Sequence, residues 1–198
     1  MIQERPYQFM YTLFVLGELL DNPLSGYQLR DILGYVIGTR VKVSWGNIYP
    51  LLDKLSTSGD ITLTAVADEN THPQKLATIT EQGIQHFREL MSAPIKPGKN
   101  EELEYVFKLD NLHHVSTDQA IGVLTNFIDY QKEIQAVAEH AITSINGNEH
   151  IQPTDQFTSS SLNRYRVGQA VAAIAWAQAL QKELAAGVLT KLRSKESL

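Results

Sequence analysis

A seam of mostly apolar residues in the C-terminal half most constrains how this chain can fold. Its members are spaced alternately four and three residues apart: Ala120, Leu124, Phe127, Gln131, Ile134, Ala138, Ala141 and Ile145. Ile121, Ile128 and Ile142 lie beside them. This heptad spacing predicts one long helix that packs on a partner helix. At ~1.5 Å per residue, about thirty residues would span roughly 45 Å.

A second long helix is expected near the C-terminus. Gly147 ends the first, 148–157 reads as a polar loop, and Ser159–Ser161 offers caps for a helix reaching about Arg193. Apolar residues cover more than one of its sides: Val171, Ile174, Trp176, Ala177, Leu180, Leu184 and Val188. We therefore predict an antiparallel pair of long helices that also packs on a second subunit and forms a homodimer.

The N-terminal half begins with two predicted helices. Pro6 can open the first, and the turn at 21–23 ends it. Ser25 and Gln28 have the spacing of a capping box, so a second helix should start at Gly26 and run to about Gly34.

A strand, a third helix and a β-ribbon are expected next. Residues 38–43 alternate and are β-branched, and Ser44 can cap a helix with four regularly spaced apolar residues, Ile48, Leu51, Leu52 and Leu55. Strands over 61–66 and 74–79 flank a polar tip, and Thr80 can cap a fourth helix. The order helix, helix, strand, helix, strand, strand, helix predicts a winged helix-turn-helix.

Two prolines and a glycine in 93–98 predict a stiff connection between domains. We expect a winged-helix DNA-binding domain over 1–95 and a helical dimerisation and effector-sensing domain over 96–198. Asn100 can cap a short helix at the start of the second domain, and Ser116 can cap the long one. The predicted fold class is mainly α with a small β-wing.

Composition bounds the function. The absence of cysteine excludes disulfides and thiolate zinc sites, and favours the cytoplasm. The apolar run over 9–16 is too short to span a membrane and is interpreted as a core helix. The net charge of -5 argues against a nucleic-acid binder, but residues 25–80 carry five acids and five bases. Binding would then depend on local placement of charge.

No catalytic or metal motif is found in the sequence. His113 and His114 are adjacent and lack the spacing of a zinc-binding helix, so solvated loop histidines are the favoured interpretation. Ser159–Ser161 has no glycine elbow, and there is no glycine-rich phosphate loop. We expect neither an enzyme nor a metal or cofactor site.

A group of cationic, hydroxyl and amide side chains surrounds the third helix. Cations and hydroxyls hold phosphates, and asparagine can read adenine edges in the major groove. The candidate DNA-binding residues are Arg40, Lys42, Ser44, Trp45, Asn47, Tyr49 and Lys54. The alternative is an ordinary solvated helix face, in a winged-helix protein-interaction module that binds no DNA.

Four segments resemble the PadR-type transcriptional regulators: 15–20, 24–29, 47–52 and 77–83. They carry a glycine-tyrosine pair opening the second helix, a tyrosine-proline-x-leucine core in the third, and a threonine-x-x-glycine after the wing. The resemblance implies a homodimer that binds palindromic operators in double-stranded DNA and is often released by a small molecule. Its wing would offer His72 and Lys75 as cations, beside two acids.

An aromatic effector pocket is a further expectation. Trp176 with Tyr165, and Tyr7 or Tyr11 from the first helix, could form its walls and bind a small aromatic or phenolic ligand. The alternative for these four side chains is plain core packing. The sequence thus predicts a repressor-like regulator controlled by a ligand.

Overall fold

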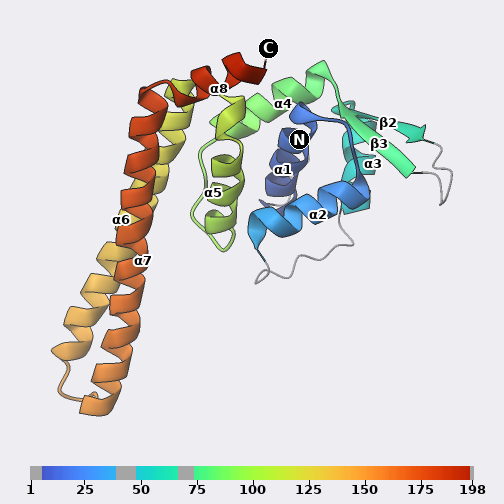
Figure 1. Ribbon diagram of the computed structural model, residues 1–198. Coiled ribbons are helices and arrows are strands. Elements are labelled where there is room, and N and C mark those ends of the chain that lie inside the picture. The colour runs from blue at the N-terminus through green and yellow to red at the C-terminus, as the bar shows by residue number, and fades with distance from the viewer. Residues whose placement is uncertain (1–5, 39–47, 67–73, 197–198) are drawn as a thin grey trace. The chain divides into compact units, whose positions relative to one another are not determined.

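The structure is a computed structural model that describes residues 6–38, 48–66 and 74–196 (Figure 1). Side chains are described in these ranges except for residues 6–9, 74 and 193–196. The chain divides into two compact units, Met1–Val115 and Ser116–Leu198. Each unit is mainly helical, and the first contains a small sheet, as the sequence predicted.

The first unit contains α1 and the other described helices that surround it. They are α1 (Pro6–Asp21), α2 (Gly26–Ile37), α3 (Ile48–Ser58), α4 (Glu81–Ser92), α5 (Glu101–Asp110) and the 3₁₀ helix η2 (Leu112–His114). Helix α1 contacts the α-helices α2 to α5 and one strand, so Leu13, Phe14 and Leu16 are completely buried. The interpretation of 9–16 as a core helix is confirmed where side chains are described, from Met10 onward.

The sheet forms the wing. Its strands are β1 (Leu24–Ser25), β2 (Ile61–Val66) and β3 (Gln74–Ile79), in the antiparallel order β1-β3-β2. The predicted strands over 61–66 and 74–79 are confirmed, and their register runs from Ile61 opposite Ile79 to Val66 opposite Gln74. The two-residue β1, which pairs with β3 at Ala77 and Leu76, was not predicted because two residues show no alternation.

Local capping rules account for most helix starts. The capping box is present: the Gln28 backbone N–H donates to Ser25 Oγ at 3.3 Å, and the Ser25 backbone N–H donates to Gln28 Oε1 at 2.8 Å. The Thr80 side chain caps α4. By contrast, Asn100 makes no side-chain capping bond, so that prediction is wrong. Instead, three glutamates in the first turn of α5 interact favourably with the positive end of the helix dipole.

The second helix is longer than expected. It passes through Gly34 and ends at Ile37, where Gly38 adopts a φ of +71°. A glycine within a helix lowers its stability by only ~1 kcal/mol, so packing of Leu29 and Leu33 outweighs it. The predicted strand over 38–43 and the Ser44 cap lie, apart from Gly38, outside the described residues.

A buried aspartate anchors the base of the wing to α4. Asp60 precedes β2, and its carboxylate accepts bonds from Ser58 Oγ at 2.8 Å and Gln82 Nε2 at 3.3 Å. The Nδ1 atom of His86 lies 3.0 Å from the same carboxylate. The Thr80 backbone N–H donates to the carbonyl oxygen of Asp60. The wing base is therefore fixed to the helix that follows it.

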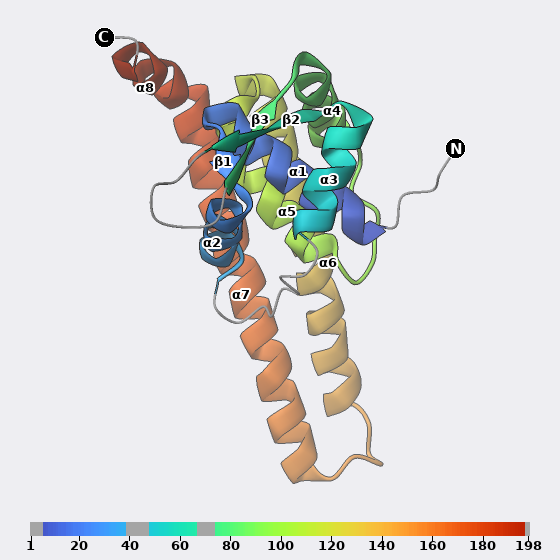
Figure 2. The same cartoon turned by 90° about the vertical axis from the view of Figure 1, so that its right-hand side faces the viewer.

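The second unit is a helical hairpin. Helices α6 (Thr117–Asn146) and α7 (Pro153–Ala185) lie side by side in both views, and the short α8 (Val188–Glu196) follows (Figures 1 and 2). Ser160 donates to Asn146 Oδ1 at 2.8 Å, and Gln181 donates to Thr125 Oγ1 at 2.9 Å. These bonds join the end of each helix to the start of the other, so the pair is antiparallel.

The hairpin corrects the predicted limits of the last helix. Helix α7 starts at Pro153, six residues before Ser159, because proline suits the first helical turn. It ends at Ala185, and Gly187 with a φ of +77° separates it from α8. The long helix α6 and its cap at Ser116 are confirmed.

The unit boundary follows Val115, whereas the sequence placed a domain boundary after residue 95. Helix α5 packs against α1 and α2, which explains why the structure groups it with the winged helix. Among the helices that the structure describes, none is both long and apolar enough to cross a membrane.

Candidate DNA-binding surface

Helix α3 has one buried face and one exposed face. The four predicted core residues, Ile48, Leu51, Leu52 and Leu55, are each at most 5% exposed. Tyr49, on the other side, is 60% exposed, and Pro50 and Asp53 are also exposed. Pro50 is the third residue of the helix, where a missing N–H costs little. The helix therefore presents Tyr49 outward from a fixed apolar base.

The position of Tyr49 depends on Gly26, the first residue of α2. A Cβ atom added to Gly26 would lie 2.7 Å from Cε1 of the Tyr49 ring, closer than real Cβ contacts. Only glycine leaves space for the ring at this place. The glycine of one helix and the tyrosine of the next thus form a single packing contact.

Helix α2 adds an exposed aromatic and cationic stripe that the sequence reasoning missed. The Arg30 guanidinium carbon lies 4.1 Å from the centre of the Tyr27 ring, and Arg30 pairs with Asp31 at 3.1 Å. Tyr35 is 86% exposed on the same helix. The spacing of 27, 30, 31 and 35 places these residues near one another along the helix, and this signal was available in the sequence.

The predicted site residues are only partly described. Tyr49 is exposed on α3, Lys54 is half-buried on the same helix, and Lys75 is exposed on β3 opposite Ala65. Six predicted residues lie outside the described part: Arg40, Lys42, Ser44, Trp45, Asn47 and His72.

The four predicted effector residues occupy different environments. Tyr11 is buried in the first unit, with its ring centre 5.8 Å from that of Phe107. Trp176 and Tyr165 are exposed on α7, and Trp176 meets Phe127 of α6 edge to face at 6.0 Å. The side chain of Tyr7 is outside the description.

Glu18, Asp110 and Lys108 are among the groups of the first unit that have shifted pKa values. Burial, reinforced by Asp110 and Asp21, raises the pKa of Glu18 from 4.5 to about 7. Burial also raises the pKa of Asp110, whose carboxyl shares a hydrogen bond with that of Glu18. Burial lowers the pKa of Lys108, whose ammonium group donates to the carbonyl oxygens of Met91 and Ala93 at the end of α4.

Helices α1 to α3, the antiparallel ribbon of β2 and β3 and the following helix α4 define the first unit as a winged-helix domain. Residues 15–89 match the Transcriptional regulator PadR-like family. This part of the chain is similar to that family of transcriptional regulators, which confirms the resemblance in the sequence.

Three solved structures align with most of the chain. Bacillus subtilis PadR in complex with operator DNA has 19% identity and a TM-score of 0.42, covering 88% of this chain and 98% of that one. A PadR-like transcriptional regulator from Bacillus cereus has 18% identity and a TM-score of 0.40, covering 92% and 98%. The Vibrio cholerae virulence activator AphA has 21% identity and a TM-score of 0.35, covering 88% and 98%. No curated protein matches the chain.

Proposed function

We propose that this chain is a DNA-binding transcriptional repressor that binds a palindromic operator in double-stranded DNA as a homodimer. The observation that carries the proposal is the exposed Tyr49 on a helix whose opposite face is buried, within a PadR-like domain. Helix α3 enters the major groove, and two half-sites lie about one helical turn, ~34 Å, apart.

Affinity in this protein comes from a few cations placed around α3 rather than from overall charge. The chain has a net charge of -5, so distant charges repel the phosphate backbone. Lys54 on α3 and the exposed Lys75 on β3 supply phosphate contacts, together with Arg40, Lys42, Ser44 and His72. Asn47 reads base edges, and Trp45 belongs to the same groove-facing surface. Binding should therefore weaken steeply with salt.

A gel shift against the promoter of the chain's own gene tests this function. Tyr49→Ala should weaken binding, and Lys42→Ala and Lys75→Ala should each lower the log-log salt slope by about one unit. Lys132→Ala is the control, because it removes the same charge from exposed α6. Unchanged binding and slope in the three test variants would contradict the proposed surface. No binding by the wild type at low salt would favour a protein-interaction module instead.

The proposed homodimer uses a second seam on α7. The predicted seam of α6 packs on α7 of the same chain, and its members Ala120, Leu124, Phe127 and Ala138 are buried. On α7 another set with alternating spacings of three and four is exposed throughout: Leu162, Tyr165, Gln169, Ala172, Trp176, Ala179 and Glu183. Its small alanines allow close approach of another helix, and its large apolar side chains gain from burial.

A charge placed in this outer seam tests the dimer. Ala172→Glu should produce monomers by light scattering at micromolar concentration, because two such charges would face an apolar interface. Gln178→Glu adds the same charge to an exposed position of α7 outside the seam and should leave the dimer intact. A monomeric wild type, or a dimeric Ala172→Glu variant, would contradict this interface.

The proposed effector is a small aromatic or phenolic compound that contacts Trp176. Within one subunit this side chain is half exposed and its ring lies edge-on to Phe127, so in the proposed dimer an aromatic ligand would contact it at the interface between the two subunits. Tyr165 lies on the same outer seam, whereas Tyr11 is buried against Phe107 within the first unit. With Trp45→Phe as background, Trp176 is the sole tryptophan, and planar phenolic acids should shift its emission. The absence of any shift would exclude this site.

A further inference from the structure

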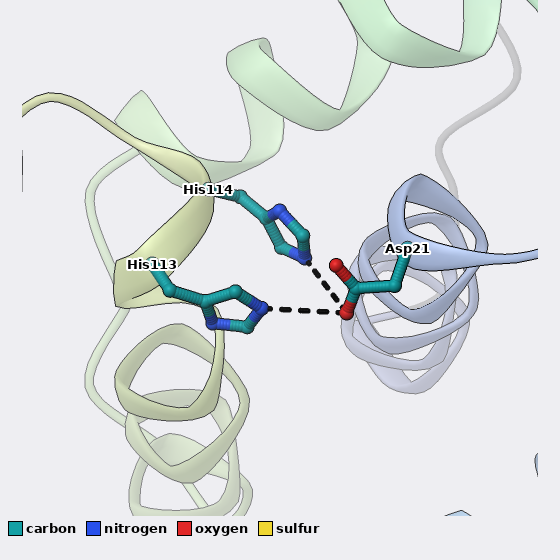
Figure 3. A group of neighbouring side chains, drawn as sticks. All are labelled: Asp21, His113 and His114. Atoms are coloured by element: carbon teal, nitrogen blue, oxygen red, sulfur yellow. Dashed lines mark hydrogen bonds and ion pairs between the residues drawn. The ribbon is translucent and has the colours of Figure 1, made fainter. Parts of the chain in front are cut away.

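Three potential metal ligands meet where α1 ends and η2 begins, within the first unit. Figure 3 shows the imidazoles of His113 and His114 pointing at the carboxylate of Asp21. The Nε2 atoms of His113 and His114 lie 3.4 Å and 3.5 Å from the same oxygen, Oδ2. One ligand atom from each side chain lies within 4.8 Å of the others. These three residues are called the cluster Asp21–His113–His114 below.

The orientation of His113 calls for a positive species between its ring and Asp21. Its Nδ1 atom lies 3.0 Å from the backbone carbonyl oxygen of Asp110. A carbonyl only accepts, so Nδ1 carries a hydrogen, and a neutral ring then turns the lone pair of Nε2 toward a carboxylate oxygen. Either a second proton or a metal ion removes this repulsion. Metal-bound histidines commonly donate their other ring N–H to a backbone carbonyl in this way.

Two of the three ligand separations fit a tetrahedral transition-metal ion. With metal–ligand bonds of about 2.1 Å, neighbouring ligands of a tetrahedral zinc site lie roughly 3.4 Å apart. The two separations from Asp21 Oδ2, 3.4 Å and 3.5 Å, match this edge. Two imidazoles and one carboxylate suit Zn²⁺ and its neighbours in the first row, whereas Mg²⁺ and Ca²⁺ prefer oxygen ligands alone.

One side chain of the cluster is mostly buried, and the other two are accessible from solvent. The side chain of His114 is only 12% exposed, and its ring meets Phe87 edge to face at 5.8 Å. The side chains of His113 and Asp21 are 48% and 54% exposed, so an ion can enter from solvent. We propose that Asp21, His113 and His114 bind one divalent transition-metal ion of the zinc class, with water completing its coordination.

This site would cross-link segments that are far apart in sequence. Asp21 ends α1 just before the turn into α2, and the histidine pair follows α5, 92 residues later. An ion bound only by the folded unit stabilises it by mass action. Metal binding is therefore measurable both directly and as a rise in melting temperature, and neither readout depends on DNA binding.

The test uses full-length protein without an affinity tag. Zn²⁺ is titrated in competition with a chromophoric chelator, and Co²⁺ is added separately to read its visible absorption. The wild type should bind one ion per chain. His113→Gln, His114→Gln and Asp21→Asn should each weaken binding at least about tenfold, since each removes a ligand. His150→Gln is the control, because His150 is exposed in the connection between α6 and α7.

Thermal melts complete the test. Zn²⁺ should raise the melting temperature of the wild type and His150→Gln, and it should not raise that of His113→Gln; Mg²⁺ should raise neither. If the half-buried His114 variant unfolds, the exposed His113 and Asp21 variants still decide the result. Absence of Zn²⁺ binding, or binding that is equal in wild type and ligand variants, would overturn the proposal and leave an imidazolium–carboxylate ion pair.

Discussion

Gly83→Ala should destabilise the protein, although alanine is the better helix former. Gly83 lies in the first turn of α4, where a Cβ atom would lie 2.1 Å from the carbonyl oxygen of Asp60 and 2.8 Å from Cγ1 of Ile79. Ordinary contact starts at 3.4 Å, so backbone must move by more than 1 Å. That movement would break the hydrogen bond that the Thr80 hydroxyl donates to the carbonyl oxygen of Gly59 or Asp60. It would also break the one that the hydroxyl accepts from the Gly83 N–H.

Three contributions to the free energy of unfolding compete in the Gly83→Ala variant. Helix propensity favours alanine by ~1 kcal/mol. Overpacking against backbone costs ~1–3 kcal/mol, and losing the Thr80 cap costs ~1 kcal/mol. We expect the free energy of unfolding to fall by about 2 kcal/mol, measured by urea unfolding followed with far-ultraviolet circular dichroism.

Two other glycines provide matched controls. Gly122 in α6 and Gly168 in α7 have nothing within 4 Å of an added Cβ atom. Alanine at either position should raise the free energy of unfolding by ~0.5–1 kcal/mol. A Gly83→Ala variant that is as stable as the wild type, or more stable, would refute the close approach of α4 to Asp60.

Three further predictions concern the first unit. Because the folded pKa of Glu18 is raised, the stability that its proton contributes is fully present below about pH 4.5 and is lost as the pH rises through about 7. Between pH 5 and 8, Glu18→Gln should therefore become more stable than the wild type by about 2 kcal/mol, after allowance for solvent screening. Equal pH profiles of the two proteins would contradict this. Lys108→Met should lower the free energy of unfolding by about 2 kcal/mol in urea, because two carbonyls at the end of α4 lose their donor; unchanged stability would show that these bonds contribute nothing. Gly26→Ala should weaken operator binding by displacing the Tyr49 ring and should have little effect in a Tyr49→Ala background; additive losses in this double-mutant cycle would exclude the coupling.

Local rules predicted the parts of the fold that depend on neighbours in sequence. The Ser25–Gln28 capping box, the Thr80 cap and strands β2 and β3 follow from residues at most a few positions apart. Strand β1 could not be predicted this way, since its two residues become a strand only through the edge of β3. The limits of α7 were missed because serines inside a helix have the same composition as serines at its cap.

The polar clusters depend on contacts that the sequence does not order. Asp60 meets His86 across 26 positions, and Asp21 meets His113 across 92. Adjacent histidines lack metal-binding spacing on one helix, and the sequence does not show that tertiary packing brings Asp21 beside them. The exposed stripe of α2 was not predicted, although the spacing of its residues is visible in the sequence.

The anchored base of the wing makes this protein a tolerant scaffold for change. Six cross-strand pairs, beginning at Ile61 opposite Ile79, and the contact of Asp60 with Thr80 set the direction of strands β2 and β3. Substitutions of exposed residues outside these contacts should consequently cost little stability. A duplicated copy of such a gene could therefore change its surface residues while keeping the same folded framework.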